Sequence, residues 1–521
     1  MTVIETITAE TRADSNRASM RQWWTVAVVC FALALVIASM VAFYSALPEM
    51  ARETGATQAQ LTWIVDGYTV ALACLVLPAG AIGDRFGRRQ TLIAGLAIFA
   101  AASVIPLLVD QPLWLVVSRV IAGVGAAFVM PSTLSLITST LPEQQHGRAV
   151  GLWAGVAGSG AAIGMVGSGL LLSWWSWQSL FVSFAVGSLV LTALAFALPE
   201  SRDESPHRID VAGGFAVTIA VGSLVIALTE GPTHGWSSPI VYGGLVIGIV
   251  ATAVFIAIEL RVEHPLLPLE LFRDRGFSAA ALTLTGQNAA MYAIFFVLVQ
   301  YLQLILSYGP LLSAVALGPI VGPIVLIGVV APWLSDKIGL RAMCASGMAA
   351  LGIGLWLISR TTVESDYGDL VWGLLVLGIG AGLSASPATT AIMGATPAEK
   401  HGVAAAVNDV TREFGAAIGI AITGSVLAAG YADKIAPALP QLPAEARGPV
   451  SDSLAAALEV ADAAGPAGNS LAAFADSAFL YGAERASVIL MLVTLAIAAA
   501  LVFLAPGRVR RHDLPKNGTN A

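Results

Sequence analysis

Five ionisable side chains lie inside long apolar stretches of the sequence, where a charge is costly. They are Asp66, Arg119, Asp409, Arg412 and Glu413. In a membrane-spanning helix such groups by default face the bundle interior and mark paths for ions or substrates. A low-dielectric environment favours the neutral form of a carboxyl group, so that it can load and release a proton near neutral pH. These residues are therefore the candidates for proton chemistry.

Asp66 and Glu413 are the acids that we expect to exchange a proton for a cationic substrate, because both ions compete for one negative charge. Other roles stay open. Asp66 could be a helix-start residue near the surface, and Glu413 could form a static ion pair with Arg412 or another buried base. Asp409 could be only an intrahelical partner of Arg412, which follows it by three residues. Arg119 could be a gate, a proton-coupling base or a group that binds backbone carbonyls.

The composition is that of an integral membrane protein. Of 521 residues, 57% are apolar and 11% are charged, whereas soluble proteins carry about 25% charged residues. The apolar runs are long and unbroken, which favours helices over the alternating pattern of a transmembrane barrel. Three cysteines lie in apolar runs without metal-ligand spacing and six histidines do not cluster. We therefore expect no metal site.

Fourteen apolar stretches are long enough to span a bilayer as helices, which takes about 20 residues each. The first follows a polar tail and is too long for a signal-peptide core, so it is predicted to be a retained span. Most of the 26 Lys and Arg residues fall in the tails and in alternate loops, which predicts that both termini are cytoplasmic. The stretches cover about 25–47, 61–79, 91–109, 112–139, 149–172, 178–198, 211–229, 239–259, 277–307, 312–334, 342–359, 369–393, 402–428 and 485–505.

A charged turn at Gly80–Arg89 separates the second and third stretches, and a similar turn at Leu334–Arg341 separates the tenth and eleventh. Such same-sense repeats are typical of transporters with two halves around a central cavity. The sequence thus predicts an all-α membrane protein of two six-helix bundles. The expected parts are a tail at 1–22, a first bundle at 23–200, two inserted helices with linkers at 201–275, a second bundle at 276–506, and a tail at 507–521. Residues 430–484 are predicted to be an extracellular surface loop rather than a functional lid.

The two turns are candidates for a conformational latch between the halves. An aspartate such as Asp84 can cap the N-terminus of a neighbouring helix, and Arg88 can bridge to carboxylates of the other half. These contacts would form in an outward-open state and break in an inward-open one; plain topological anchoring by positive charge is the simpler alternative. The predicted latch residues are Gly80, Asp84, Arg85, Gly87, Arg88, Arg89, Asp336 and Arg341.

In these residues the sequence resembles the major facilitator superfamily, and in particular its fourteen-span drug:proton antiporter branch. The Gly80–Arg89 turn matches the first cytoplasmic-loop signature of that superfamily at almost every position. Arg119 with Ala122-Gly123 and Gly125 is similar to the buried-arginine motif of the family. Segment 63–68, Trp-Ile-Val-Asp-Gly-Tyr, looks most like the quaternary-ammonium efflux pumps. Glu413, two residues before a glycine, resembles the acid of the matching helix in those pumps.

The sequence departs from the family pattern at two positions. The family usually has an aspartate in the first helix, nine residues before a proline, and here Ser39 stands nine residues before Pro48. In the fifth helix Met165 stands where proline is expected, although the antiporter-like glycines Gly160, Gly164 and Gly169 are present. Close helix packing explains these glycines as well as an antiport hinge does.

A substrate cavity is expected to have an aromatic, weakly polar lining, which suits lipophilic cations through cation–π contacts. Each candidate could instead face lipid. The candidates are Trp63, Tyr68, Trp153, Gln287, Asn288, Tyr292, Gln300 and Asn408.

The resemblance implies a secondary transporter rather than an enzyme, which exports lipophilic, cationic drugs or antibiotics across the inner (cytoplasmic) membrane by proton antiport and alternating access. The sequence has no Gly-x-x-x-x-Gly-Lys-Ser/Thr motif for ATP, so we expect no cofactor and a proton gradient as the energy source. The expected partners are a small lipophilic substrate, protons and membrane lipid, without nucleic acid, and we expect a monomer. The alternatives are export of an endogenous metabolite or lipid, which Ser39 favours, and a membrane sensor or scaffold without transport.

Overall fold

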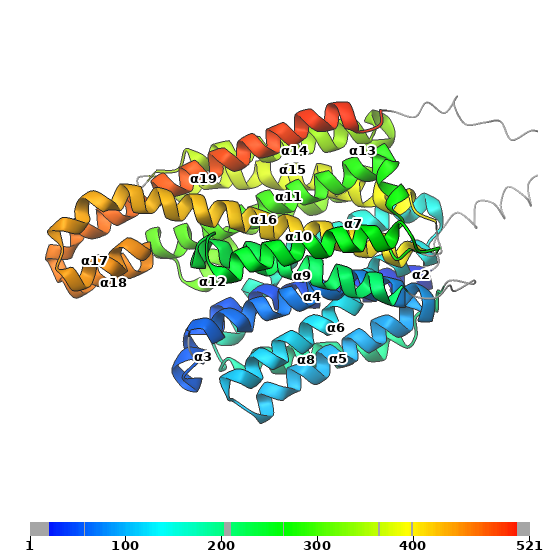
Figure 1. Ribbon diagram of the computed structural model, residues 1–521, viewed down its shortest axis with the longest axis horizontal. Coiled ribbons are helices and arrows are strands. Elements are labelled where there is room, and N and C mark those ends of the chain that lie inside the picture. The colour runs from blue at the N-terminus through cyan, green and yellow to red at the C-terminus, as the bar shows by residue number, and fades with distance from the viewer. Residues whose placement is uncertain are drawn as a thin grey trace, which may run out of the picture.

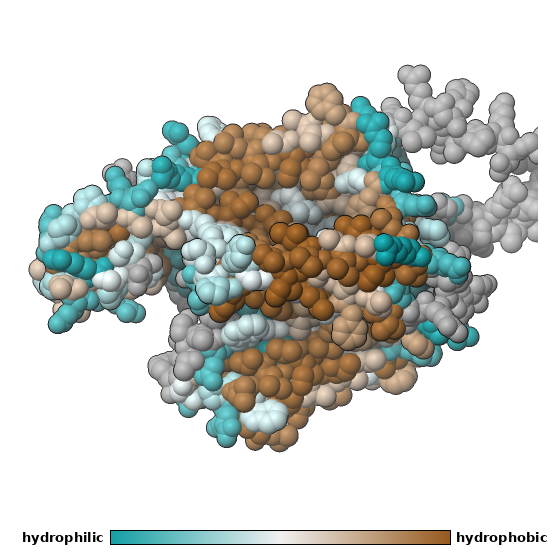
Figure 2. Space-filling view, in the orientation of Figure 1, coloured by the Kyte–Doolittle hydropathy of each residue, from teal (hydrophilic) through white to brown (hydrophobic). Residues whose placement is uncertain are grey.

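The computed structural model describes residues 20–507 except 57, 203–209, 264, 363–364 and 398–399. Within these residues the chain folds into helices and short turns, without strands. On the face seen in Figure 2, apolar residues cover a broad band across the middle of the molecule, and hydrophilic residues gather at both ends. This distribution is what a helical bundle needs in order to satisfy its backbone hydrogen bonds within hydrocarbon. The predicted all-α membrane fold is confirmed.

The first half of the molecule contains six spans. A short 3-10 turn, η1 (Phe43–Ala46), continues the first span, and the short helix α3 (Leu47–Thr54) follows it. The spans are α2 (Met20–Ala42), α4 (Gln58–Phe86), α5 (Arg88–Leu108), α6 (Pro112–Thr140), α7 (Glu143–Leu172) and α8 (Gln178–Ala195).

Two inserted helices, α9 (Val211–His234) and α10 (Pro239–Glu259), connect the halves and pack against each other. Both begin with a side-chain cap. Asp210 accepts a hydrogen bond from the backbone N–H of Gly213, and Ser238 accepts one from Val241. These caps satisfy backbone donors that the first turn of a helix leaves free.

The second half repeats the six-span arrangement after the short turn η2 (Leu269–Arg273). Its first span ends in a π-helical turn, η3 (Tyr301–Ile305), and its second span is broken into α12, η4 (Gly318–Ile320) and α13. The helices are α11 (Arg275–Gln300), α12 (Pro310–Ala316), α13 (Val321–Ile338), α14 (Leu340–Ser359), α15 (Tyr367–Gly394), α16 (His401–Ile435) and α19 (Asn469–Leu504).

By length and apolar character, 13 helices of the described part could cross a membrane. The fourteenth is α7, whose segments Gln144–Ala161 and Ile163–Leu172 meet at a bend of 40°. The bend lies within the glycine-rich stretch of this helix, where small residues leave the backbone free to kink. Two bundles of six with an inserted pair agree with the prediction.

The segment 430–484, predicted to be a surface loop, is largely helical. Both α16 and α19 continue well beyond their predicted ends, and 3-10 turns connect them to α17 (Ala444–Asp452) and α18 (Leu454–Ala463). Together these elements form a projection at one end of the molecule (Figure 1). The segment is rich in alanine, the strongest helix former, and this propensity outweighs its glycines and prolines.

The charged turns also differ from the prediction, because each is a single residue between two helices. Gly87 separates α4 from α5 and Gly339 separates α13 from α14, with φ angles of +115° and +87°. Glycine adopts such angles at no steric cost. We call the end of the molecule with these glycines the turn end, and the end with α17 and α18 the loop end (Figure 1).

The two halves meet along two seams. One joins α4 to α16, and the other joins α7 to α13. The inserted helix α9 packs on both α4 and α16, so it covers the first seam. In Figure 1 the two green helices α9 and α10 lie between the blue α4 and the orange α16.

Candidate functional site

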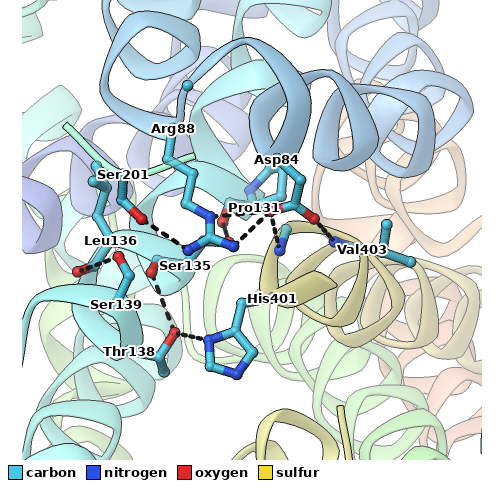
Figure 3. A network of polar contacts seen from close by, with 12 residues as sticks. Asp84, Arg88, Pro131, Ser135, Leu136, Thr138, Ser139, Ser201, His401 and Val403 are labelled. Carbon is cyan, nitrogen blue, oxygen red and sulfur yellow. Dashed lines mark hydrogen bonds and ion pairs between the residues drawn. The ribbon is translucent and has the colours of Figure 1, made fainter. Parts of the chain in front are cut away.

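At the turn end, Asp84 of α4 caps the first turn of α16. Its Oδ1 accepts a hydrogen bond of 2.8 Å from the N–H of Gly402, and its Oδ2 accepts one of 3.0 Å from the N–H of Val403 (Figure 3). A carboxylate at a helix N-terminus satisfies free N–H groups and interacts favourably with the helix dipole. The cap joins the two halves through a side chain that is itself buried.

Arg88 holds the capping carboxylate in place. Its Nε and Nη2 donate to Asp84 Oδ1 at 3.0 and 2.8 Å, and its Nη1 donates to Ser201 Oγ at 3.0 Å (Figure 3). We expected Arg88 to bridge to carboxylates of the other half, but these bonds lie within the first half. The reason is local: Arg88 follows Asp84 by four residues, so that its guanidinium group reaches back across Gly87.

The rest of the first turn is tied to the segment after α8. The backbone N–H of Arg89 donates to Glu200 Oε1 at 3.1 Å, and Arg89 Nη1 donates to the carbonyl of Leu198 at 3.1 Å. Arg85 lies over the ring of Phe86, 5.4 Å from its centroid. These contacts anchor the turn but do not cross between the halves.

The second turn is arranged differently. Asp336 is exposed and takes part in none of the ion pairs among the described residues. Arg341 Nε donates to the carbonyl of Ala505 at 2.8 Å, at the end of α19 in its own half. In this arrangement the predicted latch residues Asp336 and Arg341 do not connect the halves.

Glycines let the helices of both seams approach closely. A Cβ on Gly80 would overlap the backbone of Gly402, and a Cβ on Gly151 would overlap the carbonyl of Gly328. Small residues at such contacts are the usual means of close packing between membrane helices. Near the first of these contacts, Thr138 Oγ1 and His401 Nδ1 lie 3.0 Å apart and join α6 to α16 (Figure 3).

Arg119 sits fully buried in a cage of carbonyl, hydroxyl and aromatic groups. Its Nη1 and Nη2 donate to the hydroxyl and carbonyl of Ser39 at 2.8 and 2.9 Å, and its Nε donates to the carbonyl of Ile64 at 2.9 Å. The rings of Phe43 and Tyr68 lie 4.3 Å from its guanidinium carbon, at cation–π distance. None of the ion pairs among the described residues involves Arg119. Ser39 thus binds the arginine without neutralising it.

Two acids of α16 lack partners for one oxygen each. Glu413 is 7% exposed and Asp409 is fully buried, and Glu413 Oε2 and Asp409 Oδ2 accept no hydrogen bond in the described part of the chain. Asp409 Oδ1 accepts one from Asn408 at 3.3 Å. Arg412 forms an ion pair with neither acid. A buried carboxylate without a partner is costly, so this pair of acids is suited to carry a proton.

A narrow cavity between the halves is lined by Arg412, which lies between the two acids in the sequence, whereas neither acid belongs to its lining. It encloses about 490 Å³ of unoccupied space, part of it open to solvent, and α7, α11, α13, α15 and α16 line it. Its polar lining consists of Gln287, Asn288, Tyr292 and Arg412. Gln287 accepts a hydrogen bond of 2.8 Å from Ser384. Gln287, Asn288 and Tyr292 were predicted to line a cavity and do so. The fourth polar group of the lining is the guanidinium cation of Arg412.

Three other predicted cavity residues are buried in contacts beside the cavity. The hydroxyl of Tyr68 donates to the carbonyl of Val36 at 2.9 Å, and Trp153 Nε1 donates to Thr133 at 3.0 Å. Asn408 accepts a hydrogen bond from Thr389 at 2.9 Å. Each is held by a partner within its own half, and none of the three belongs to the lining.

The last two predicted cavity residues lie toward the ends of spans. Trp63 is in the second turn of α4 and is 38% exposed. Gln300 is the final residue of α11 and donates to the carbonyl of Phe296 in its own helix at 3.0 Å. Neither residue belongs to the lining of this cavity.

Asp66 lies on the first seam, away from the cavity lining. It is half-buried, two turns into α4, and shares a helix face with Val70 and Ala73, which pack against α9 and α16. Its charge interacts with Glu230 of α9. Arg412 lines the cavity between the halves, and Asp66 does not.

The antiporter-like glycines of α7 pack against neighbouring helices. A Cβ on Gly160 or Gly164 would overlap Ile37 or Ala38 of α2, and one on Gly169 would lie 3.3 Å from Leu311 of α12. Gly160 and Gly164 thus serve close packing within the first half.

His401 and Gly402 are site residues that our sequence reasoning missed. His401 is 9% exposed in the first turn of α16, and we gave it no role from the sequence. A sequence signal does exist: the pair His146-Gly147 stands at the start of α7, in the position that corresponds by repeat to His401-Gly402. The repeat therefore extends beyond the two charged turns.

Comparisons with known proteins agree with this architecture. The family model of the Major Facilitator Superfamily matches residues 29–420. The chain is similar to the multidrug resistance protein Stp of Mycobacterium tuberculosis, with 32% identity over 76% of this chain and 74% of Stp. It is similar to the tetracenomycin C resistance and export protein of Streptomyces glaucescens, with 30% identity over 79% and 77% of the chains. The multidrug efflux pump LfrA of Mycolicibacterium smegmatis is 28% identical over 94% and 97%.

A solved structure supports the same fold. The human organic anion transporter MFSD10 superposes with a TM-score of 0.58 at 12% identity, covering 92% of this chain and 100% of MFSD10. At this identity the likeness concerns the fold alone. Together with the family match and the two six-span halves, it places the molecule among membrane transporters rather than enzymes. The chain belongs to the Major Facilitator Superfamily.

Proposed function

We propose that this transporter exports lipophilic, cationic drugs or antibiotics from the cytoplasm by antiport with protons. Its relatives include proteins named for multidrug resistance and for antibiotic export. The observation that carries the proposal is the pair Asp409 and Glu413, two buried acids with one unpartnered oxygen each, one turn apart on α16. Protonated, they are neutral and stable in a low-dielectric interior; ionised, they attract a cation.

The proposed transport cycle alternates access at the two ends of the bundle. The arginines of the Gly80–Arg89 turn make the turn end cytoplasmic by the excess of positive charge, so both termini are cytoplasmic. In the structure this end is closed by the Asp84 cap and the close contact of Gly80 with Gly402. We assign it to a state closed toward the cytoplasm, in which the α16 acids exchange protons with the outer side.

Purified protein in vesicles provides the test. A proton gradient is imposed and the movement of a fluorescent lipophilic cation is followed for wild type, Glu413→Gln and Asp409→Asn. We expect gradient-driven movement in wild type and a loss of at least about a hundredfold in either variant, because a neutral amide cannot exchange a proton. Asp336→Asn, at an exposed acid of the turn end, is the matched control.

Wild-type protein that moves no cation from a broad panel in response to the gradient would refute the cation-export proposal. Wild-type activity with an unchanged rate and pH dependence in both α16 variants would refute only the assignment of the coupling acids.

A second candidate function is export of an anionic or neutral metabolite or lipid. The specific observation is the charge of the cavity, because Arg412 is the charged member of its lining and Ser39 leaves Arg119 without a carboxylate. A cavity wall with a positive charge favours an anion by Coulomb attraction. The same vesicles loaded with a fluorescent organic anion separate cation export from anion export, since each predicts movement of only one of the two charged probes.

A further inference from the structure

We propose that the inserted helix α9 supplies an outer proton path, in which His234 and Glu230 pass protons from the loop end to Asp66. The inference deepens the proposed function and rests on it. Asp66 lies on the α4–α16 seam and would be the outer proton acceptor from which the coupling acids Asp409 and Glu413 of α16 take up protons, so the path matters only if transport is coupled to protons. It assigns a role in the reaction to the inserted pair, whose residues lie outside the cavity lining.

The position of α9 is the first step of the argument. This helix packs on both α4 and α16, and Val225 of α9 forms a small apolar cluster with Ala73 of α4 and Ala417 of α16. Further along α9, a Cβ on Gly222 would overlap the sulfur of Cys74 in α4. The helix therefore lies directly over the first seam between the halves.

The position of Asp66 is the second step. Residues seven apart lie nearly on one face of an α-helix, so Asp66 shares the face of Ala73. That face carries the three-helix cluster and, seven residues later, Gly80, which contacts α16. Asp66 is thus directed to the same seam that α9 covers.

The register between the two helices is the third step. They run in opposite directions, and Gly222 lies opposite Cys74. Glu230 follows Gly222 by eight residues and Asp66 precedes Cys74 by eight, so an equal rise of about 1.5 Å per residue brings both acids to one level. In agreement, the charges of Glu230 and Asp66 interact.

The solvent exposure of His234, Glu230 and Asp66 is the fourth step. The side chain of His234 is 55% exposed, whereas that of Glu230 is only 14% exposed, and His234 Nδ1 lies 2.7 Å from Glu230 Oε2. Asp66 is half-buried within the seam. Solvent exposure therefore decreases sharply from His234 to the acid that it contacts.

The proton transfers balance without any further reactant. A proton taken up from the outer solution makes His234 an imidazolium cation, whose Nδ1–H donates to Glu230 Oε2. Transfer leaves neutral imidazole and a carboxylic acid, which in turn passes its proton to the Asp66 carboxylate, directly or through water. Histidine is suited to the first step because its charge changes between about pH 5 and 8.

The charged groups on α16 and α10 lie away from this level, and Tyr44 of η1 is a further titratable group whose charge interacts with Asp66. On α16, Glu413 is one turn from Ala417, and Asp433 and Lys434 lie near the loop end. On α10, Tyr242 is in the first turn and Glu259 is at the far, turn end. Asp66 is the titratable group of α4 whose charge interacts with Glu230.

The test measures export of a fluorescent lipophilic cation at outer pH values from 5.5 to 8.5, with the membrane potential collapsed and the inner pH fixed. We expect Glu230→Gln and His234→Gln each to lower the rate about tenfold at the alkaline end. At the acidic end both should match wild type, because abundant protons reach Asp66 without the relay. Asp433→Asn, an exposed acid paired with Arg485 at 3.5 Å near the same end, is the control and should keep the wild-type profile.

Exchange of labelled for unlabelled substrate in vesicles separates a relay from a structural role, since it needs no net proton transfer. The exchange rate should stay at the wild-type value in both variants. A parallel loss of exchange, or a loss of export that is equal at all pH values, would overturn the relay. If Glu230→Gln does not fold, His234→Gln alone decides the matter. No gradient-driven export by wild type would instead refute the underlying function.

Discussion

The two seams between the halves of this transporter are alike in packing and different in charge. Each brings two helices into contact at glycines, Gly80 against Gly402 in one seam and Gly151 against Gly328 in the other. Among the residues that the structure describes, only the α4–α16 seam has a buried carboxylate that caps a helix of the opposite half. In the repeat, Asp336 corresponds to Asp84 but is exposed.

This difference assigns packing between the halves and polar contacts between the halves to different residues of a repeated fold. The glycines give both seams a surface on which the halves can approach and part. The polar groups gather at one seam: Asp84 at its turn end, Asp66 toward its loop end, and the inserted helix α9 along its side. We therefore expect the α4–α16 seam to control closure and proton access, and the α7–α13 seam to provide packing alone.

The largest expected effect comes from removing the capping carboxylate. Asp84→Ala takes away both acceptors for α16 and the carboxylate that Arg88 binds, and breaking a buried ion pair costs about 3–5 kcal/mol. In the proposed cycle the cap stabilises the closed turn end, so its loss shifts the balance between the two states and transport should fall at least about tenfold. Vesicle transport measures the rate, and labelling of a cysteine introduced near the turn end measures closure.

Asp336→Ala makes the matched change in the other turn. Because Asp336 is exposed, we expect transport and labelling to stay close to wild type. Equal losses in the two variants would show that both turns act as latches and would abolish the distinction between the seams.

The second prediction concerns the close glycine contacts that both seams contain. Gly80→Ala and Gly151→Ala each place a methyl group against the backbone of the opposite half. Overpacking of this kind costs about 1–3 kcal/mol, so both variants should unfold at lower temperature and transport several-fold more slowly. Thermal unfolding in detergent is the measurement, with Gly167→Ala as the control, since a Cβ there meets nothing within 4 Å. A loss in one seam only would contradict the symmetry of packing.

The smallest effect should come from the contact between the inserted pair and α16. Trp236 Nε1 donates to Ser425 Oγ at 2.9 Å, at an exposed site. Trp236→Phe removes this hydrogen bond, whose net contribution is about 0.5–1.5 kcal/mol, and should lower the unfolding temperature slightly while transport persists. A large loss of transport would give this contact a role in closure that we do not assign to it.

Much of the fold could be predicted from the sequence because membrane insertion is a local property. Long apolar runs, the repeated charged turns and the excess of positive charge each depend on neighbouring residues. The continuation of α16 and α19 beyond their apolar stretches was not predicted, for a physical reason. Hydropathy marks where a helix leaves the membrane, and it does not mark where the helix ends.

The site was less predictable because its contacts join distant parts of the chain. The capping of α16 by Asp84 spans 318 residues, and no local pattern shows that Asp336 lacks the equivalent contact. The hydroxyl of Ser39 as a partner of Arg119 is visible only once α2 and α6 are packed. Sequence reasoning found the acids of α16 because charge within an apolar run is rare, and that signal is local.

Proton release on substrate binding tests the central claim most directly. Purified protein in weakly buffered detergent solution is mixed with a lipophilic cation, and a pH indicator counts the protons released as the cation binds. The account predicts about one proton released per cation in wild type, and none in the double variant Asp409→Asn with Glu413→Gln. Binding by wild type without proton release, or undiminished release by the double variant, would contradict it.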